Sequence, residues 1–285
     1  MVNERTFAGR AFDAANIVLL TLVSLATLLP FVYVVVASFS ATDDIIPKSF
    51  TLSAYRYLFS TDTFVRSLGI SIYITVVGTV LSLVATALSA YALSHRKLPG
   101  RRFFLLLVLF TMLFNGGMIP TYFVVKDLGM INTLWSLMIP GLISSFYLII
   151  MKNFFLEIPE DLKEAARIDG CTELGVLFRV VLPLSLPVLA AFGLLYAVGI
   201  WNQYFNAILY INDQTKWPIQ VLLQQIVVLA SGGFGNAAGS ADAVQVFGQG
   251  VRMAVIVVST IPILIVYPFL QKHFAKGMLI GSVKG

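Results

Sequence analysis

The stretch IPEDLKEAARIDGCTELGVLFRVVLPLSLP, Ile158–Pro187, places short helices between two long apolar runs of the chain. Pro159 suits the first turn of a helix, and the two acidic residues after it lie where the helix dipole favours anions. Gly170 is a helix stop, and Thr172 can cap a second helix. The spacing therefore predicts two consecutive short helices within one polar loop.

On both sides of this loop the chain is long enough and apolar enough to cross a bilayer repeatedly. A span needs about 20 mainly apolar residues, and six stretches qualify: about 17–39, 70–93, 103–125, 135–151, 184–211 and 253–270. The third is interrupted by Asn115-Gly116-Gly117, which predicts a helix break. We expect an all-α polytopic membrane protein, with residues 1–285 forming a single transmembrane domain and 152–183 its main loop.

Composition excludes a soluble fold. Of the 285 residues, 58% are hydrophobic and 12% are charged, whereas soluble chains carry about 25% charged residues. The net charge is +5, but the sequence has no basic cluster typical of nucleic-acid binding. One cysteine cannot form an intrachain disulfide, and two distant histidines, His95 and His273, predict no metal site.

Orientation follows from the Lys and Arg residues, which favour the cytoplasmic side of a membrane. Most of them fall inside when the N-terminus is cytoplasmic, including Arg96, Lys97, Arg101 and Arg102 before the third span. Six spans then place both termini, and the loop 152–183, in the cytoplasm.

The first helix of the loop has two interpretations. The small residues Ala165 and Ala166 allow close approach of another protein, and Glu164 offers a carboxylate to a partner's cation or amide. An amphipathic helix lying on lipid is the alternative. The helix is mainly acidic, which is unfavourable beside anionic lipid, and this favours a protein partner.

The same loop resembles the EAA loop of ABC-importer permeases. The resemblance is carried by Glu164-Ala165-Ala166, by Asp169-Gly170, and by Phe178, Leu182-Pro183 and Pro187. Cys171 departs from the family pattern, in which Ala is usual. The resemblance implies a cytoplasmic coupling helix that docks on an ATPase subunit and uses Glu164, Ala165, Ala166, Asp169 and Gly170.

Three further segments resemble the carbohydrate branch of that family. They are the final run GMLIGSVKG (Gly277–Gly285), NGGMIPTY (Asn115–Tyr122) and WNQYFNAI (Trp201–Ile208). The tail is similar to that of the second permease of maltose-type importers, and the other two runs are closest to permeases for alginate or pectin fragments. The resemblance implies that Gly281 and Lys284 also belong to the coupling machinery.

Polar residues in the predicted spans are candidates for the solute pathway, since such residues usually face a cavity or the bundle interior. Asn202, Asn206 and Tyr210 recur every four residues, so a continuous fifth helix would place them on one face. Gln203 adds an amide, and aromatic rings can stack on a sugar. Candidate pathway residues are therefore Asn115, Trp201, Asn202, Gln203, Tyr204 and Asn206. Hydrogen bonding between helices is the alternative role for these amides.

The chain has no G-x-x-x-x-G-K-[ST] motif for ATP phosphates and no catalytic triad pattern. We therefore expect a transport subunit rather than an enzyme, with no cofactor of its own and with ATP and Mg²⁺ bound by partner chains. The resemblance implies a homologous second permease, two ATPase subunits and an extracellular solute-binding protein. The expected function is import of an oligosaccharide, such as an acidic alginate or pectin fragment, across the bacterial cytoplasmic membrane. Import of glycerol phosphate, a polyol or another small solute is the alternative, and a secondary transporter or a membrane enzyme fits less well because no acidic residue or nucleophile cluster lies in the spans.

Overall fold

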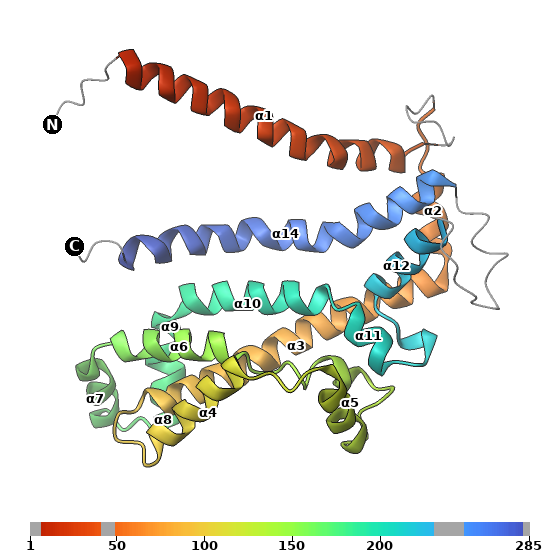
Figure 1. Cartoon of the computed structure of the whole chain (residues 1–285). Coiled ribbons are helices and arrows are strands. Elements are labelled where there is room, and N and C mark those ends of the chain that lie inside the picture. The colour runs from red at the N-terminus through yellow and green to blue at the C-terminus, as the bar shows by residue number, and fades with distance from the viewer. Residues whose placement is uncertain (1–6, 41–48, 231–247, 282–285) are drawn as a thin grey trace. The chain divides into compact units, whose positions relative to one another are not determined.

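The structure, a computed structural model, describes residues 7–40, 49–230 and 248–281. Within these ranges the regular secondary structure is helical apart from an antiparallel bridge between Ser40 and Phe50, and turns and loops connect the helices (Figure 1). This confirms the all-helical prediction. The described residues belong to two compact units, one within 1–61 and 226–260 and the other within 62–225 and 261–285.

The first unit contains α1 (Phe7–Ser38), α2 (Ser53–Ser60) and the first turns of α14 (Gln249–Gly281). α1 exposes nearly all of its large apolar side chains between Phe12 and Val35, as expected of a helix in lipid. Near its end the hydroxyl groups of Ser38 and Tyr55 are 2.6 Å apart, which fixes α2 beside α1.

The second unit is built around α3 (Asp62–Ser94), which packs along α10 (Leu186–Trp201) and α6 (Ser145–Glu157). α3 approaches α10 closely at Gly78, where a Cβ atom would lie 2.9 Å from Ile200 Cδ1. Apolar side chains form two buried clusters in this bundle. One includes Tyr91, Met151, Phe155, Val176 and Leu177, and the other includes Ile74, Val125, Met138, Ile200 and Tyr210.

The predicted break in the third apolar stretch is present. α4 (Arg101–Leu113) ends before the NGG sequence, and α5 (Met118–Asp127) starts after it. Gly117 has a φ of 84°, which residues with a Cβ atom rarely adopt. Asn115 Oδ1 accepts a hydrogen bond of 2.9 Å from the Gly117 amide, so the asparagine stabilises the turn.

The fifth stretch, predicted as a continuous helix over 184–211, is interrupted twice. The helical segments Glu173–Leu184 and Leu186–Trp201 meet at an angle of 85° around Ser185. Pro183 and Pro187 flank this bend, and a proline removes a backbone donor from a helix. α10 then ends at Trp201, and α11 (Phe205–Tyr210) starts separately. The prediction of one continuous helix here is wrong.

The fourth stretch, 135–151, also differs from the prediction. Only its second part belongs to α6, which starts at Ser145 and extends to Glu157, while η1 (Leu134–Leu137) covers the first part. Pro140 lies between the two elements, where a continuous helix would need its missing N–H. The 13 residues of α6 rise about 20 Å, less than the apolar thickness of a bilayer.

By length and composition, three described helical ranges can cross a membrane: Phe12–Ser38, Asp62–Ser94 and Gln249–Val266. The bent pair around Ser185 makes a fourth if it is one span. The count of six spans stays a prediction. The remaining short elements are α7 (Glu160–Ile168), α8 (Glu173–Val176), the π-helical turn η2 (Leu177–Val181), α9 (Leu182–Leu184), η3 (Gln214–Lys216) and α12 (Ile219–Ala230).

Candidate functional site: the loop at α7 and the polar residues after α10

α7 forms where the sequence predicts it. Pro159 precedes the helix with an extended backbone, and Glu160 and Asp161 occupy the first turn. The helix ends before Gly170, whose φ of 83° is the left-handed conformation expected of a C-terminal stop. Thr172 Oγ1 accepts from the amide of Gly175 at 3.2 Å and caps α8, also as predicted.

α7 presents most of the predicted coupling residues to solvent. Glu164, Ala165, Asp169 and Gly170 are exposed, whereas Ala166 is half-buried and packs against the apolar cluster around Tyr91. The adjacent Ile168 is the most exposed large apolar side chain of the chain's described part, at 85%. Leu162, Leu174 and Phe178 are also exposed. This part of the loop combines small, acidic and apolar groups on an uncovered surface.

The opposite face of α7 is attached to α6 by a buried lysine. Lys163 is 4% exposed, and its ammonium donates to the Phe155 carbonyl and to Glu160 Oε2, each at 3.2 Å. Phe155 lies in the last turn of α6, where carbonyl groups lack helical partners and a cation is favourable. Lys163 therefore fixes α7 to the end of α6.

A second set of ionic contacts connects α7 to α8 and α3. Arg167 donates from Nη1 to Glu160 at 3.1 Å and from Nε to Glu173 at 2.8 Å. Glu173 also accepts a hydrogen bond of 2.8 Å from the Tyr91 hydroxyl, and His95 Nε2 lies 3.6 Å from the same carboxylate. Partial burial opposes ionisation of Glu160, but the hydrogen bonds from Arg167 and Lys163 outweigh it and hold its pKa below the usual value.

Sequence reasoning missed these supporting residues. The spacing of Lys163 and Arg167, three and seven positions after Glu160, was the available signal, because it places all three on one helix face. Glu173 and Tyr91 gave no such signal, since they are 82 positions apart and meet only through the tertiary fold.

A charged cleft lies beside α7. Its volume is about 780 Å³, and it is lined by residues 94–97 at and after the end of α3, by the end of α6 and by α7. Lining side chains include His95, Arg96, Lys97, Glu157, Lys163 and Glu164. The cleft can therefore accept a polar or charged segment of another chain next to the exposed face of α7.

Contrary to the prediction, Asn202, Asn206 and Tyr210 do not share the face of one helix, because α10 ends at Trp201 and α11 starts separately at Phe205. Asn202 is exposed, and its amide turns back to the Val198 carbonyl at 2.9 Å. Gln203 donates to the Leu137 carbonyl at 2.9 Å, while its Oε1 is buried without a hydrogen-bond partner among the described residues. Tyr204 is half-buried beside the second cluster, and Asn206 is exposed on α11.

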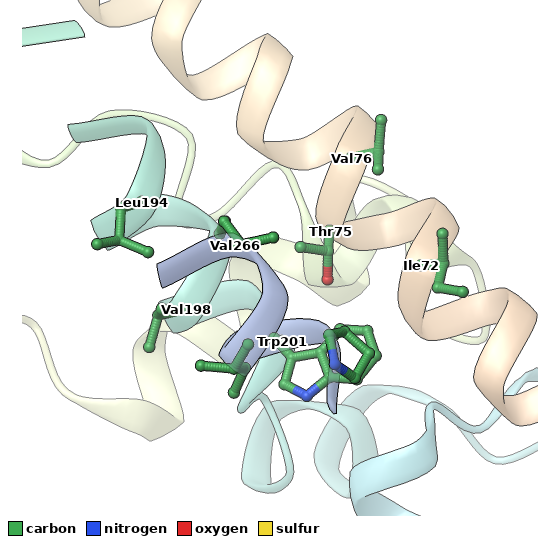
Figure 2. Close-up of a pocket in the computed structure, with 10 residues that line it drawn as sticks. Ile72, Thr75, Val76, Leu194, Val198, Trp201 and Val266 are labelled. Atoms are coloured by element: carbon green, nitrogen blue, oxygen red, sulfur yellow. The ribbon is translucent and has the colours of Figure 1, made fainter. Parts of the chain in front are cut away.

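Trp201 has an apolar environment. It is 3% exposed and lines a pocket of about 200 Å³ with residues of α3, α10 and α14. Figure 2 shows the Trp201 ring and the Thr75 side chain among the residues that line this pocket. Such a pocket suits an apolar group better than a sugar ring. Asn115 is exposed and serves the turn at Gly117.

The assignment of the two tail residues, Gly281 and Lys284, to the coupling machinery stays a prediction. α14 continues to Gly281, so the helix extends well beyond the predicted end at residue 270. Lys284 lies outside the described residues.

Comparison with known proteins gives a consistent result. The family model "Binding-protein-dependent transport system inner membrane component" matches residues 102–280. Protein LplC of Bacillus subtilis is 55% identical over 289 residues, covering 99% of this chain and 98% of LplC. The polygalacturonan/rhamnogalacturonan transport system permease protein YtcP of the same organism is 52% identical over 284 residues, covering 97% of this chain and 99% of YtcP.

Solved structures agree. The chain is similar to a crystal structure of a bacterial ABC transporter involved in the import of the acidic polysaccharide alginate. The TM-score is 0.86 at 35% identity, over 94% of this chain and 98% of that chain. A crystal structure of an alginate ABC transporter with an alginate pentasaccharide-bound periplasmic protein gives a TM-score of 0.58 at 14% identity, over 94% and 96% of the two chains, and supports the fold alone.

Proposed function

Because the chain belongs to the family of binding-protein-dependent transport system inner membrane components, we propose that it is a membrane subunit of an ABC importer for acidic oligosaccharides. YtcP, at 52% identity, is named for polygalacturonan and rhamnogalacturonan, and the structural relative at 35% identity imports alginate. These polymers share uronic acid units. Oligosaccharides containing uronic acids are therefore the proposed solute class.

The observation that carries the proposal is the exposed surface of α7. Glu164, Ala165 and Ile168 lie uncovered at one end of the unit around α3, while Lys163 and Arg167 attach the helix to that unit. A helix that is firmly attached on one face and uncovered on the other is suited to transmit force from a partner. We assign this surface to an ATPase subunit, which binds the ATP and Mg²⁺.

The proposed assembly contains this chain, a homologous second permease, two ATPase subunits and an extracellular solute-binding protein in the bacterial cytoplasmic membrane, with both termini of this chain cytoplasmic. ATP binding draws the two ATPases together and moves α7. That movement opens the solute pathway toward the binding protein, and hydrolysis resets it. Asn202, Gln203 and Asn206 are the proposed polar contacts of the pathway, with Gly281 and Lys284 near the ATPases.

Uptake by the intact assembly tests this function. The chain is purified through a tag with its native partners, reconstituted in proteoliposomes and supplied with ATP and the solute-binding protein. We expect uptake of a labelled galacturonate oligosaccharide that stops without ATP. Uptake of glycerol phosphate or a polyol in its place would reassign the solute, and uptake driven by an ion gradient without ATP would reject the function.

A further inference from the structure

The carboxylate of Glu173 contacts two other elements of the second unit. Its Oε1 accepts from Arg167 Nε of α7 at 2.8 Å, and its Oε2 accepts from the Tyr91 hydroxyl of α3 at 2.8 Å. His95, one turn after Tyr91, places Nε2 3.6 Å from the same Oε2. Three elements, α3, α7 and α8, therefore meet at a single side chain.

The two sides of this contact differ in how firmly they are held. Tyr91 is 6% exposed and packs within the apolar cluster that contains Met151 and Phe155, with its ring edge-on to His95 at 4.7 Å. Arg167 lies on α7, whose outer face is uncovered. The carboxylate thus connects a side chain anchored in the core to the helix that we assign to the ATPase contact.

The short backbone segment between α7 and α8 makes the side-chain contacts of Glu173 important for the orientation of α7. It passes through residues 169–172, and Gly170 has a left-handed φ of 83°. The orientation of α7 relative to α3 then depends on the side chains that join them, and the Arg167–Glu173–Tyr91 contacts provide such a join.

We propose that Glu173 is a positioning residue that transmits movement of α7 to α3, through Arg167 on one side and Tyr91 on the other. The inference rests on the proposed function for its role in transport. It assigns no contact between Glu173 and the solute or the ATPase. Loss of the join should leave the assembly intact and let ATP hydrolysis continue with less solute moved.

Two variants remove the join with little change in packing. Tyr91→Phe deletes one hydroxyl and keeps the buried ring, and Glu173→Ala removes the exposed carboxylate. Tyr147→Phe is the matched control, because it deletes a hydroxyl from another ring that packs against the same cluster, on α6. The readout is the number of ATP molecules hydrolysed per galacturonate oligosaccharide imported by the reconstituted assembly.

We expect Tyr91→Phe and Glu173→Ala each to raise this ratio by about tenfold, as expected for a lost hydrogen bond to a charged group, with normal recovery of the ATPase subunits. The double variant should be no worse than Glu173→Ala, since both changes break one connection. An unchanged ratio, additive effects, or loss of the ATPase subunits from the assembly would overturn the positioning role.

A second measurement tests the join without relying on transport. A spin label is placed at the exposed position 165 by Ala165→Cys in a Cys171→Ala chain, and its mobility is measured in the purified protein. Tyr91→Phe should increase the mobility of α7, and Tyr147→Phe should not. Equal mobility in all three chains would overturn the join, whereas absence of ATP-driven uptake by the unmodified assembly would reject only the proposed function.

Discussion

At the residue scale, the loop depends on side chains that sequence patterns do not identify as functional. Lys163 lies one position before Glu164, yet it faces the opposite way and is buried, while Glu164 is exposed. A buried ammonium is stable only when it is paired and hydrogen-bonded. The Phe155 carbonyl and Glu160 meet that requirement here.

Replacing this lysine should therefore destabilise the fold. Lys163→Met keeps most of the aliphatic volume but leaves the Phe155 carbonyl without its donor, which costs about 1–3 kcal/mol. We expect a lower midpoint of thermal unfolding for the detergent-solubilised protein. Lys126→Met, at an exposed lysine of α5, is the control and should unfold like the original chain. Equal midpoints for both variants would show that Lys163 contributes no stability.

The lowered pKa of Glu160 predicts a response to acid. A carboxyl whose folded-state pKa is depressed stabilises the fold above its unfolded pKa of about 4.3, and this contribution is lost as pH falls through the folded pKa. Thermal stability should therefore decrease more steeply below about pH 4.5 in the original chain than in Glu160→Gln. Parallel stability curves for the two proteins between pH 3 and 7 would contradict this assignment.

At the element scale, close helix contacts rather than long apolar runs determine the packing. In the first unit, a Cβ atom on Gly250 of α14 would lie 2.6 Å from the Ser40 carbonyl oxygen, a backbone atom that cannot rotate away. In the second unit, Gly78 of α3 meets the flexible end of Ile200. The first contact is the stricter one, because side chains can adjust and the backbone cannot.

Alanine at Gly250 should therefore destabilise the fold, whereas alanine at an open glycine should not. Gly250→Ala forces the first turn of α14 away from Ser40, and overpacking of this kind costs about 1–3 kcal/mol. Gly199→Ala on α10 meets nothing within 4 Å and should be neutral or stabilising by up to about 1 kcal/mol. Thermal unfolding of the two variants checks this, and a Gly250→Ala protein as stable as Gly199→Ala would refute the close contact.

The sequence predicts the elements whose signals are local. The NGG sequence marks the break before Met118, and Pro159 and Gly170 mark the ends of α7, because proline and glycine act on their own backbone. The bend at Ser185 was missed although Pro183 and Pro187 flank it, and the end of α10 at Trp201 was missed because the polar residues Asn202 and Gln203 that follow were assigned to the same helix. Periodicity reports which residues are apolar and cannot report where a helix turns. For this reason the prediction that Asn202 and Asn206 lie on one helix face was wrong.

At the scale of the whole molecule, the proposed function depends on a contact with another chain. The family to which the chain belongs and the exposed face of α7 support a role as a subunit whose movement is driven by another chain. The chain supplies the surface, the internal contacts at Lys163 and Glu173, and the polar residues after α10. The proposed function requires α7 to touch an ATPase subunit in the assembled importer.

Site-specific cross-linking of the intact assembly measures that contact directly. In a Cys171→Ala chain, Ala165→Cys places a thiol on the exposed face of α7, and Gln214→Cys places one at the exposed η3 as the control. A short bifunctional reagent should join position 165, and not position 214, to an ATPase subunit, and cleaving the reagent should restore ATP-driven uptake. An assembly that retains its ATPases but gives no cross-link from position 165, or an equal yield from position 214, would contradict the account.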